Sequence, residues 1–205
     1  ATLDSVSDRV IVGLALSTTH AYRDKGVPLI RNQNIRRGYF EDHDMLYLDP
    51  QFAELFPSKA LRLNDVLTVR TGANVGDTAT VPPEYVDCLT FTTLITSPSK
   101  DSLNSAYLVN YIASENGERE LNRLLVGGGK ENLNVGEFIK LRISLPPVDE
   151  QARIIKSLET IDNKIGHERI AVNKFQQQKT GLMQDLLTGK VRVTFNERSE
   201  ETAHG

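Results

Sequence analysis

A regular stripe of apolar residues between positions 149 and 187 constrains the fold of this chain more than any other feature. Read in alternating steps of four and three residues, eight of the ten positions in the stripe are apolar. This is the period of a coiled-coil seam, so the sequence predicts one long helix over residues 149–187. The stripe consists of Ile154, Leu158, Ile161, Ile165, Glu168, Val172, Phe175, Lys179, Leu182 and Leu186.

Both ends of this predicted helix carry the expected signals. Asp149 and Glu150 stand in its first turn, where the helix dipole favours acids, and Thr188-Gly189 is a stop signal. A helix of about 39 residues is roughly 58 Å long, which exceeds the reach of a domain of about 125 residues. We therefore predict that the eight apolar positions pair with a partner helix. A helix that lies along its own domain is the alternative.

From Gly26 onward the chain reads as short apolar runs separated by turn residues, which is typical of a strand-rich domain. Apolar residues at helical spacing predict a helix within 103–125, and strict alternation over 139–145 predicts a half-buried strand. We expect a mixed α/β fold, with a strand-rich domain over residues 1–148 followed by the coiled-coil helix. The apolar runs expected to form strands cover residues 27–30, 45–48, 66–69 and 90–95.

The two ends of the chain are less informative. Residues 1–21 contain an apolar run at 10–16 whose length fits either a strand or a short buried helix. After the long helix, residues 188–205 are expected to contain a short strand at 190–195 and then a polar, disordered tail. The role of residues 1–21 stays open.

Charge and composition limit the functions open to the chain. Its net charge is -3, and residues 22–145 carry 14 Lys and Arg against 16 Asp and Glu, whereas a domain that binds DNA by itself usually has a basic excess. DNA binding would need basic residues grouped on one face, or a partner that supplies most phosphate contacts. No apolar run approaches the roughly 20 residues of a membrane span, and the single Cys88 excludes a disulfide framework. We expect a cytoplasmic protein.

No set of residues has the spacing of a known catalytic or metal site. The four histidines are scattered, and Lys130 is followed by Glu131 where a phosphate-binding loop needs Ser or Thr. The pairs Pro82-Pro83 and Pro146-Pro147 lack the polar residue and the aromatic of an amino-methyltransferase motif. We therefore expect a chain that is not an enzyme and that has no metal or cofactor of its own.

Side chains suited to reading base edges follow two predicted strands and the glycine-rich segment. In the major groove Arg pairs with guanine, and Asn or Gln pairs with adenine; residues 31–37, 70–74 and 130–134 carry these types. Each loop alone is typical of an ordinary polar turn, but three in one domain favour recognition. The candidate DNA contacts are Arg31, Gln33, Asn34, Arg36, Arg37, Arg70, Thr71, Asn74, Lys130, Asn132 and Asn134.

Several motifs, taken in order along the chain, resemble those of specificity subunits of type I restriction-modification systems. The resemblance covers residues 22–195. The family usually carries two recognition domains that alternate with two long helices, whereas this chain has one of each. The motifs are Gly26 to Arg31 with Asn34-Ile35, Leu63 to Leu67, Arg70 to Gly76, Gly129-Lys130 with Asn132-Leu133-Asn134, Leu145-Pro146-Pro147-Val148-Asp149-Glu150-Gln151, Ile161-Asp162 with Lys164-Ile165, and Leu186 to Val193.

The resemblance implies a division of labour. A target-recognition domain over residues 1–148 would bind double-stranded DNA, modification subunits that carry S-adenosylmethionine would methylate adenine, and a restriction subunit would use ATP and Mg²⁺. Two copies of this chain would pair as a homodimer through the helix and address two half-sites. The alternative is a protein-interaction or scaffold module with the same helix and no DNA specificity, which the acidic charge favours.

Overall fold

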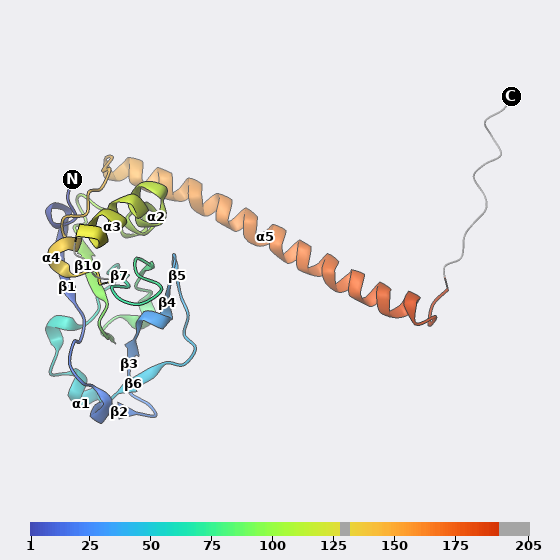
Figure 1. Ribbon diagram of the computed structural model, residues 1–205, viewed down its shortest axis with the longest axis horizontal. Coiled ribbons are helices and arrows are strands. Elements are labelled where there is room, and N and C mark those ends of the chain that lie inside the picture. The colour runs from blue at the N-terminus through green and yellow to red at the C-terminus, as the bar shows by residue number, and fades with distance from the viewer. Residues whose placement is uncertain (128–131, 193–205) are drawn as a thin grey trace. The chain divides into compact units, whose positions relative to one another are not determined.

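Two sheets of short strands form the body of the first part of the chain in the computed structural model, which describes residues 1–127 and 132–192 (Figure 1). The chain divides into two units, Ala1–Lys156 and Ser157–Gly205. The long helix α5 spans Val148–Leu187. The predicted mixed α/β fold, a strand-rich part followed by a long helix, is confirmed.

The first sheet has four antiparallel strands and contains two of the apolar runs noted in the sequence. The run at 66–69 forms β7, and the run at 10–16 contributes to a strand, β1, that begins earlier, at Ser7. Val, Ile and Thr are frequent in these strands because branched side chains pack well on a pleated surface. The strands, in order of hydrogen bonding, are β1 (Ser7–Val12), β10 (Leu94–Pro98), β7 (Val66–Thr68) and β8 (Thr78–Thr80).

The second sheet is mixed, because β3 pairs with β6 in an antiparallel arrangement and with β9 in a parallel one. The predicted run at 90–95 is divided between the two sheets, and Thr92 adopts a positive φ of 56° at the division. A separate hairpin of β4 (Ile35–Arg36) and β5 (Tyr39–Phe40) turns at Arg37-Gly38. The strands of the second sheet are β2 (Tyr22–Arg23), β6 (Leu46–Leu48), β3 (Val27–Ile30) and β9 (Leu89–Thr90).

The helical spacing at 103–125 is realised as two helices, α2 (Ser105–Ala113) and α3 (Glu115–Gly127). Gly117 lets α3 approach α2 closely, because a Cβ there would lie 2.1 Å from the carbonyl oxygen of Tyr111. The shorter helices are α1 (Pro50–Ala53), α4 (Val135–Phe138) and the 3₁₀ turns η1 (Asp4–Val6), η2 (Thr19–Ala21), η3 (Asn32–Asn34), η4 (Pro57–Lys59) and η5 (Pro83–Tyr85).

The predicted strand at 139–145 is wrong. Leu141 and Ile143 are buried and Arg142 is exposed, as alternation requires, but the segment forms only a single bridge, between Thr2 and Arg142. Its backbone bonds to the first residues of the chain, with Leu3 N donating to Leu141 O at 2.9 Å. Too few successive ladder bonds form for a strand. Residues 190–192 also form no strand, and the remainder of the strand predicted at 190–195 lies outside the described residues.

The N-terminal turn of α5 folds as part of the first unit. Ile155 is buried in the same apolar cluster as Leu3, Leu108 and Phe138, which joins the first sheet to α2 and α4. Gln151 is fully buried; its Oε1 accepts from Asn104 N at 2.8 Å. Its Nε2 donates to the carbonyl oxygens of Ser102 and Pro146, both at 2.8 Å. The last residue of the Leu145-to-Gln151 motif therefore holds the start of the helix to the domain.

Replacing Gln151 with Ala should destabilise the first unit by about 3 kcal/mol, because three partly buried backbone groups lose their partner. For a unit of this size, we expect the thermal midpoint to fall by roughly 6–12 °C. Circular dichroism during heating measures the change. Glu159→Gln, at an exposed position of the same helix, is the matched control and should melt like the parent chain. A loss below about 1 kcal/mol in Gln151→Ala would contradict the anchoring role.

Cys88 is buried, and desolvation raises the pKa of its thiol from 9.0 to about 11, with a smaller contribution from Asp87. The thiolate is the reactive form, so at pH 8 the folded chain should react with a disulfide reagent at least about 100-fold more slowly than the unfolded chain. The rate should then rise with pH up to about pH 11. A colorimetric thiol assay with and without denaturant measures both rates. Native labelling within tenfold of the denatured rate would show an accessible thiolate instead.

Candidate nucleic-acid interface

Three polar loops that lie far apart in the sequence meet at one place in the first unit. Asn32 Nδ2 donates to Thr71, reaching its carbonyl oxygen at 3.2 Å and its Oγ1 at 3.1 Å. Thr71 forms an antiparallel bridge with Asn132. Arg70 Nε donates to Asn132 Oδ1 at 3.1 Å. We call the meeting point of residues 31–34, 70–76 and 132–134 the three-loop cluster.

Buried strands position the first two loops. β3 ends in Leu29 and Ile30, which are both fully buried, and Arg31 follows directly. β7 is buried along its length, and Arg70 follows two residues after it. The loop from Arg70 needs glycine because Gly72 and Gly76 both have a φ of 93°, a conformation that other residues rarely adopt. A Cβ on Gly72 would meet no atom within 4 Å, so this part of the loop faces open space.

Two polar atoms of the cluster have no partner within the described parts of the chain. Arg31 Nε and Asn32 Oδ1 are buried and make no hydrogen bond there. A buried donor or acceptor without a partner costs free energy, and such atoms in a folded protein are usually satisfied by water or a ligand. The cluster therefore has hydrogen-bonding capacity that the described residues do not use.

The arginines around the cluster fall into two groups by the partner that holds them. Arg70 donates to the neutral amide oxygen of Asn132, and the Arg31 guanidinium donates to the backbone oxygen of Asp44. Within residues 1–127 and 132–192, neither one forms a salt bridge, so no carboxylate of these residues compensates its positive charge. Arg36 and Arg37, on the β4–β5 hairpin, are instead paired with carboxylates. A positive charge with free donors is what recognition of guanine or phosphate requires.

Asn34 is not available to DNA, and its prediction as a contact is wrong. It is 1% exposed, and its Oδ1 accepts from Arg31 N at 3.0 Å. Its Nδ2 donates to the carbonyl oxygens of Glu41 and His43, at 2.9 Å and 3.1 Å. The side chain thus holds the loop in shape. The local sequence gives no sign that Asn34 is buried, because the residues that engage its amide, Glu41 and His43, follow seven and nine positions later.

Asn134 is exposed, but its Oδ1 caps α4 by accepting from Glu137 N at 3.0 Å, so it has a structural function at the rim of the cluster. Gln33 is exposed, Thr71 and Asn74 are partly exposed, and the described residues offer no side-chain partner to Gln33 or Asn74. Lys130 lies outside the described residues. DNA contacts by Arg31, Gln33, Arg36, Arg37, Arg70, Thr71, Asn74, Lys130, Asn132 and Asn134 stay predictions.

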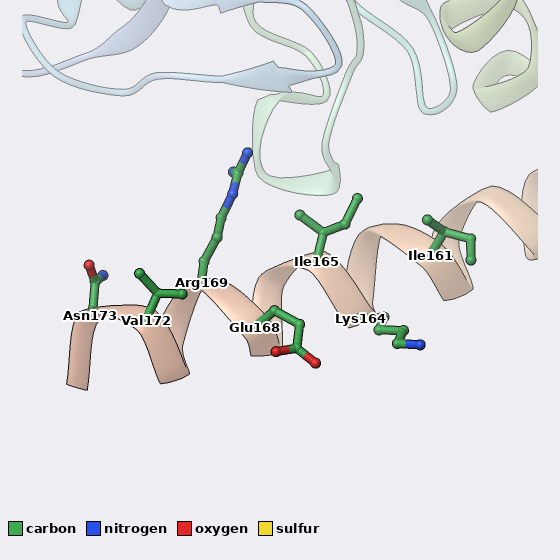
Figure 2. A pocket seen from close by; sticks show the side chains of 7 residues that line it. All are labelled: Ile161, Lys164, Ile165, Glu168, Arg169, Val172 and Asn173. Carbon is green, nitrogen blue, oxygen red and sulfur yellow. The ribbon is translucent and has the colours of Figure 1, made fainter. Parts of the chain in front are cut away.

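The apolar seam of α5 begins later than the sequence indicated. Ile154 packs against the core of the first unit, so its assignment to the dimer seam is corrected. From Leu158 onward the seam is open: Ile161 is 55% exposed and Phe175 is 68% exposed. Figure 2 shows Ile161 and Ile165 projecting from one side of the helix while Lys164 points away from it. The seam residues that stay exposed among the described residues are Leu158, Ile161, Ile165, Val172, Phe175, Leu182 and Leu186.

One contact in this region was missed by sequence reasoning. Glu118 on α3 pairs with Arg37 across 81 positions of sequence, and no local pattern marks such a pair.

In the described ranges, no group of three or more His, Cys, Asp or Glu side chains is arranged to hold a metal ion. No described helix combines the length and the apolar content needed to cross a membrane.

Known proteins resemble this chain in sequence and in fold. A family model described as the type I restriction modification DNA specificity domain matches residues 13–174. The type I restriction enzyme MjaVIII specificity subunit of Methanocaldococcus jannaschii is 22% identical over 181 residues, which cover 83% of this chain and 41% of that protein.

Two solved structures share the fold. One, from a study of complex assembly and conformational transition of the type I R-M system, has a TM-score of 0.64 at 21% identity and covers 90% of this chain and 43% of its own. The HsdS subunit from Thermoanaerobacter tengcongensis also has a TM-score of 0.64, at 18% identity, with 90% and 47% covered. This chain thus spans less than half the length of each relative. The family model matches most of the chain, and the chain therefore belongs to the family of type I restriction modification DNA specificity domains.

Proposed function

We propose that this chain recognises a specific DNA sequence and directs a type I restriction-modification complex to it. The observation that carries the proposal is the three-loop cluster, where no described carboxylate pairs with Arg31 or Arg70 and two polar atoms have no partner in the described chain. Such side chains can donate two hydrogen bonds to guanine in the major groove. Membership of the specificity-domain family supports the same function.

In this proposal the chemistry belongs to partner subunits. A modification subunit would bind S-adenosylmethionine and methylate an adenine that is flipped out of the duplex. A restriction subunit, where one is present, would use ATP and Mg²⁺ to translocate and cleave DNA. The chain itself would act in the cytoplasm and contribute no catalytic group. Partner subunits would also supply phosphate contacts, which accounts for a recognition domain that carries no basic excess.

A second copy of the chain would supply the second recognition domain. The open apolar seam of α5 supports pairing. A long helix with apolar residues at its a and d positions is stabilised when those residues pack against a partner helix. A spacer tens of Å long would hold two recognition domains about one turn of DNA or more apart. Two identical domains related by a two-fold axis would read palindromic half-sites separated by unread bases.

A mobility-shift titration of the chain on duplex DNA, with and without its modification subunit, tests the proposal. We expect the complex to prefer DNA that contains the sequence it methylates over DNA of unrelated sequence. Equal affinity for both would contradict sequence recognition. If the chain instead retained a protein partner and showed no DNA preference, the scaffold alternative favoured by its acidic charge would hold.

A further inference from the structure

The β4–β5 hairpin lies beside the three-loop cluster. η3 (Asn32–Asn34) runs directly into β4, and Gly38 N at the hairpin turn donates to Thr78 O in β8 at 2.9 Å. β8 follows the loop that begins at Arg70. Arg36 ends β4, Arg37 stands at the turn, and Tyr39, the first residue after the turn, is 55% exposed. A DNA duplex seated on the cluster would therefore also meet the hairpin.

Both hairpin arginines are already paired with carboxylates. Arg36 Nη2 lies 2.8 Å from Glu41 Oε2, and the Arg37 guanidinium pairs with Glu118 on α3. Asp77, at the end of the neighbouring loop, also interacts electrostatically with Arg37 and Arg36. Burial raises the pKa of its carboxyl group, and Arg37 and Arg36 counteract that rise. The hairpin thus contributes no net positive charge, although its sequence looks basic.

The contrast with Arg31 and Arg70 suggests a function for the pairing. Those two are held by neutral oxygen atoms, and no carboxylate among the described residues pairs with them. DNA of any sequence offers the same phosphates, so each free arginine strengthens non-specific and specific binding alike. A carboxylate that occupies an arginine removes it from this sequence-independent attraction.

We propose that Glu41 and Glu118 are specificity-determining residues: they occupy Arg36 and Arg37 and thereby lower the affinity of the chain for DNA of unrelated sequence. The inference rests on the proposed function, since it supposes that DNA binds beside the hairpin. Exposed ion pairs contribute little to stability, and both pairs are partly exposed. Removing the carboxylates should therefore release the arginines without unfolding the domain.

The test is the Glu41→Gln/Glu118→Gln variant, assembled with the modification subunit and titrated against a duplex of unrelated sequence over a range of salt concentrations. Each arginine that gains a phosphate should steepen the slope of log K against log salt by about 0.9. We expect a slope steeper by up to about 1.8, with tighter non-specific binding at low salt and a smaller ratio of specific to non-specific affinity. Adding Arg36→Gln and Arg37→Gln should cancel the gain.

Asp49→Asn is the matched control. It also removes a carboxylate from an arginine, Arg23, which lies 2.8 Å away, and Asn preserves the cap that Asp49 makes on α1. α1 lies at the opposite end of the first unit from α3 (Figure 1). This variant should leave the salt slope unchanged.

An unchanged slope in the double glutamine variant would overturn the inference. Weaker binding would also overturn it, because the glutamates would then be positioning arginines that already contact phosphate. An equal gain in Asp49→Asn would show a general charge effect and count against it too. The readout uses unrelated DNA, so it is separate from the preference of the parent complex for its own site, which tests the proposed function.

Discussion

Replacing both Leu158 and Ile165 with Asp should convert a dimer of this chain into monomers. Both side chains are large, apolar and partly exposed along the seam of α5, at 40% and 43%. In a paired coiled coil each Asp would be buried without a partner charge, at a cost of several kcal/mol per site. Light scattering coupled to size exclusion measures the mass directly, and we expect the monomer mass at all accessible concentrations.

Asn163→Asp is the matched control for this change. It introduces the same side chain at an exposed position between the two seam residues, on the outer face of the heptad. This variant should remain dimeric, which separates loss of the seam from the effect of added negative charge. A dimer that survives Leu158→Asp/Ile165→Asp would show that the helix pairs through another face or not at all. The monomeric variant should also fail to direct methylation, since it would carry only one of the two recognition domains.

Replacing Arg31 or Arg70 with Ala should weaken recognition of the cognate site by about 1–3 kcal/mol, which is roughly 5- to 150-fold in affinity. Each arginine has charge that no carboxylate among the described residues compensates, and each is held in place by a neutral acceptor. If it reads guanine, the loss will be confined to the cognate sequence, and one base of the site will become degenerate. Binding to competitor duplexes, measured beside the cognate duplex, shows the difference.

Arg62→Ala is the control for these two variants. Arg62 is an exposed arginine that precedes β7, whereas Arg70 follows the same strand, so the two lie at opposite ends of it. Its loss changes net charge by the same amount and should leave the preference for the cognate site intact. An equal loss on cognate and competitor DNA in Arg31→Ala and Arg70→Ala would make both residues phosphate contacts. No loss at all would remove the three-loop cluster from the interface.

Periodicity accounts for the features that could be predicted from sequence. A stripe that repeats over many turns fixes a long helix whatever its surroundings, so α5 was predicted within one residue of its observed start. The alternation at 141–143 correctly indicated which side chains are buried. It did not indicate that their backbone partners would be residues 1–3, because the partner of a segment is a tertiary property.

The same limit explains the errors at the candidate interface. Asn34 has the side chain of a base reader, and only the chain around it shows that its amide is fully engaged. Ile154 continues the heptad without interruption, yet the domain core takes it. The sequence marked the loops around residues 32, 71 and 132 as polar but did not indicate that they would meet, because contacts across 39 and 62 positions of sequence have no local signature. The pairing of Arg37 with Glu118 belongs to the same class.

We propose above that this chain directs a methylating complex to a specific DNA sequence. Mapping adenine methylation in cells that carry the modification subunit, with and without the chain, tests it most directly. We expect methylation at one sequence made of two palindromic half-sites separated by unread bases, and only when the chain is present. Methylation at the same positions without the chain would contradict the claim, and a contiguous or asymmetric site would contradict the symmetric pair.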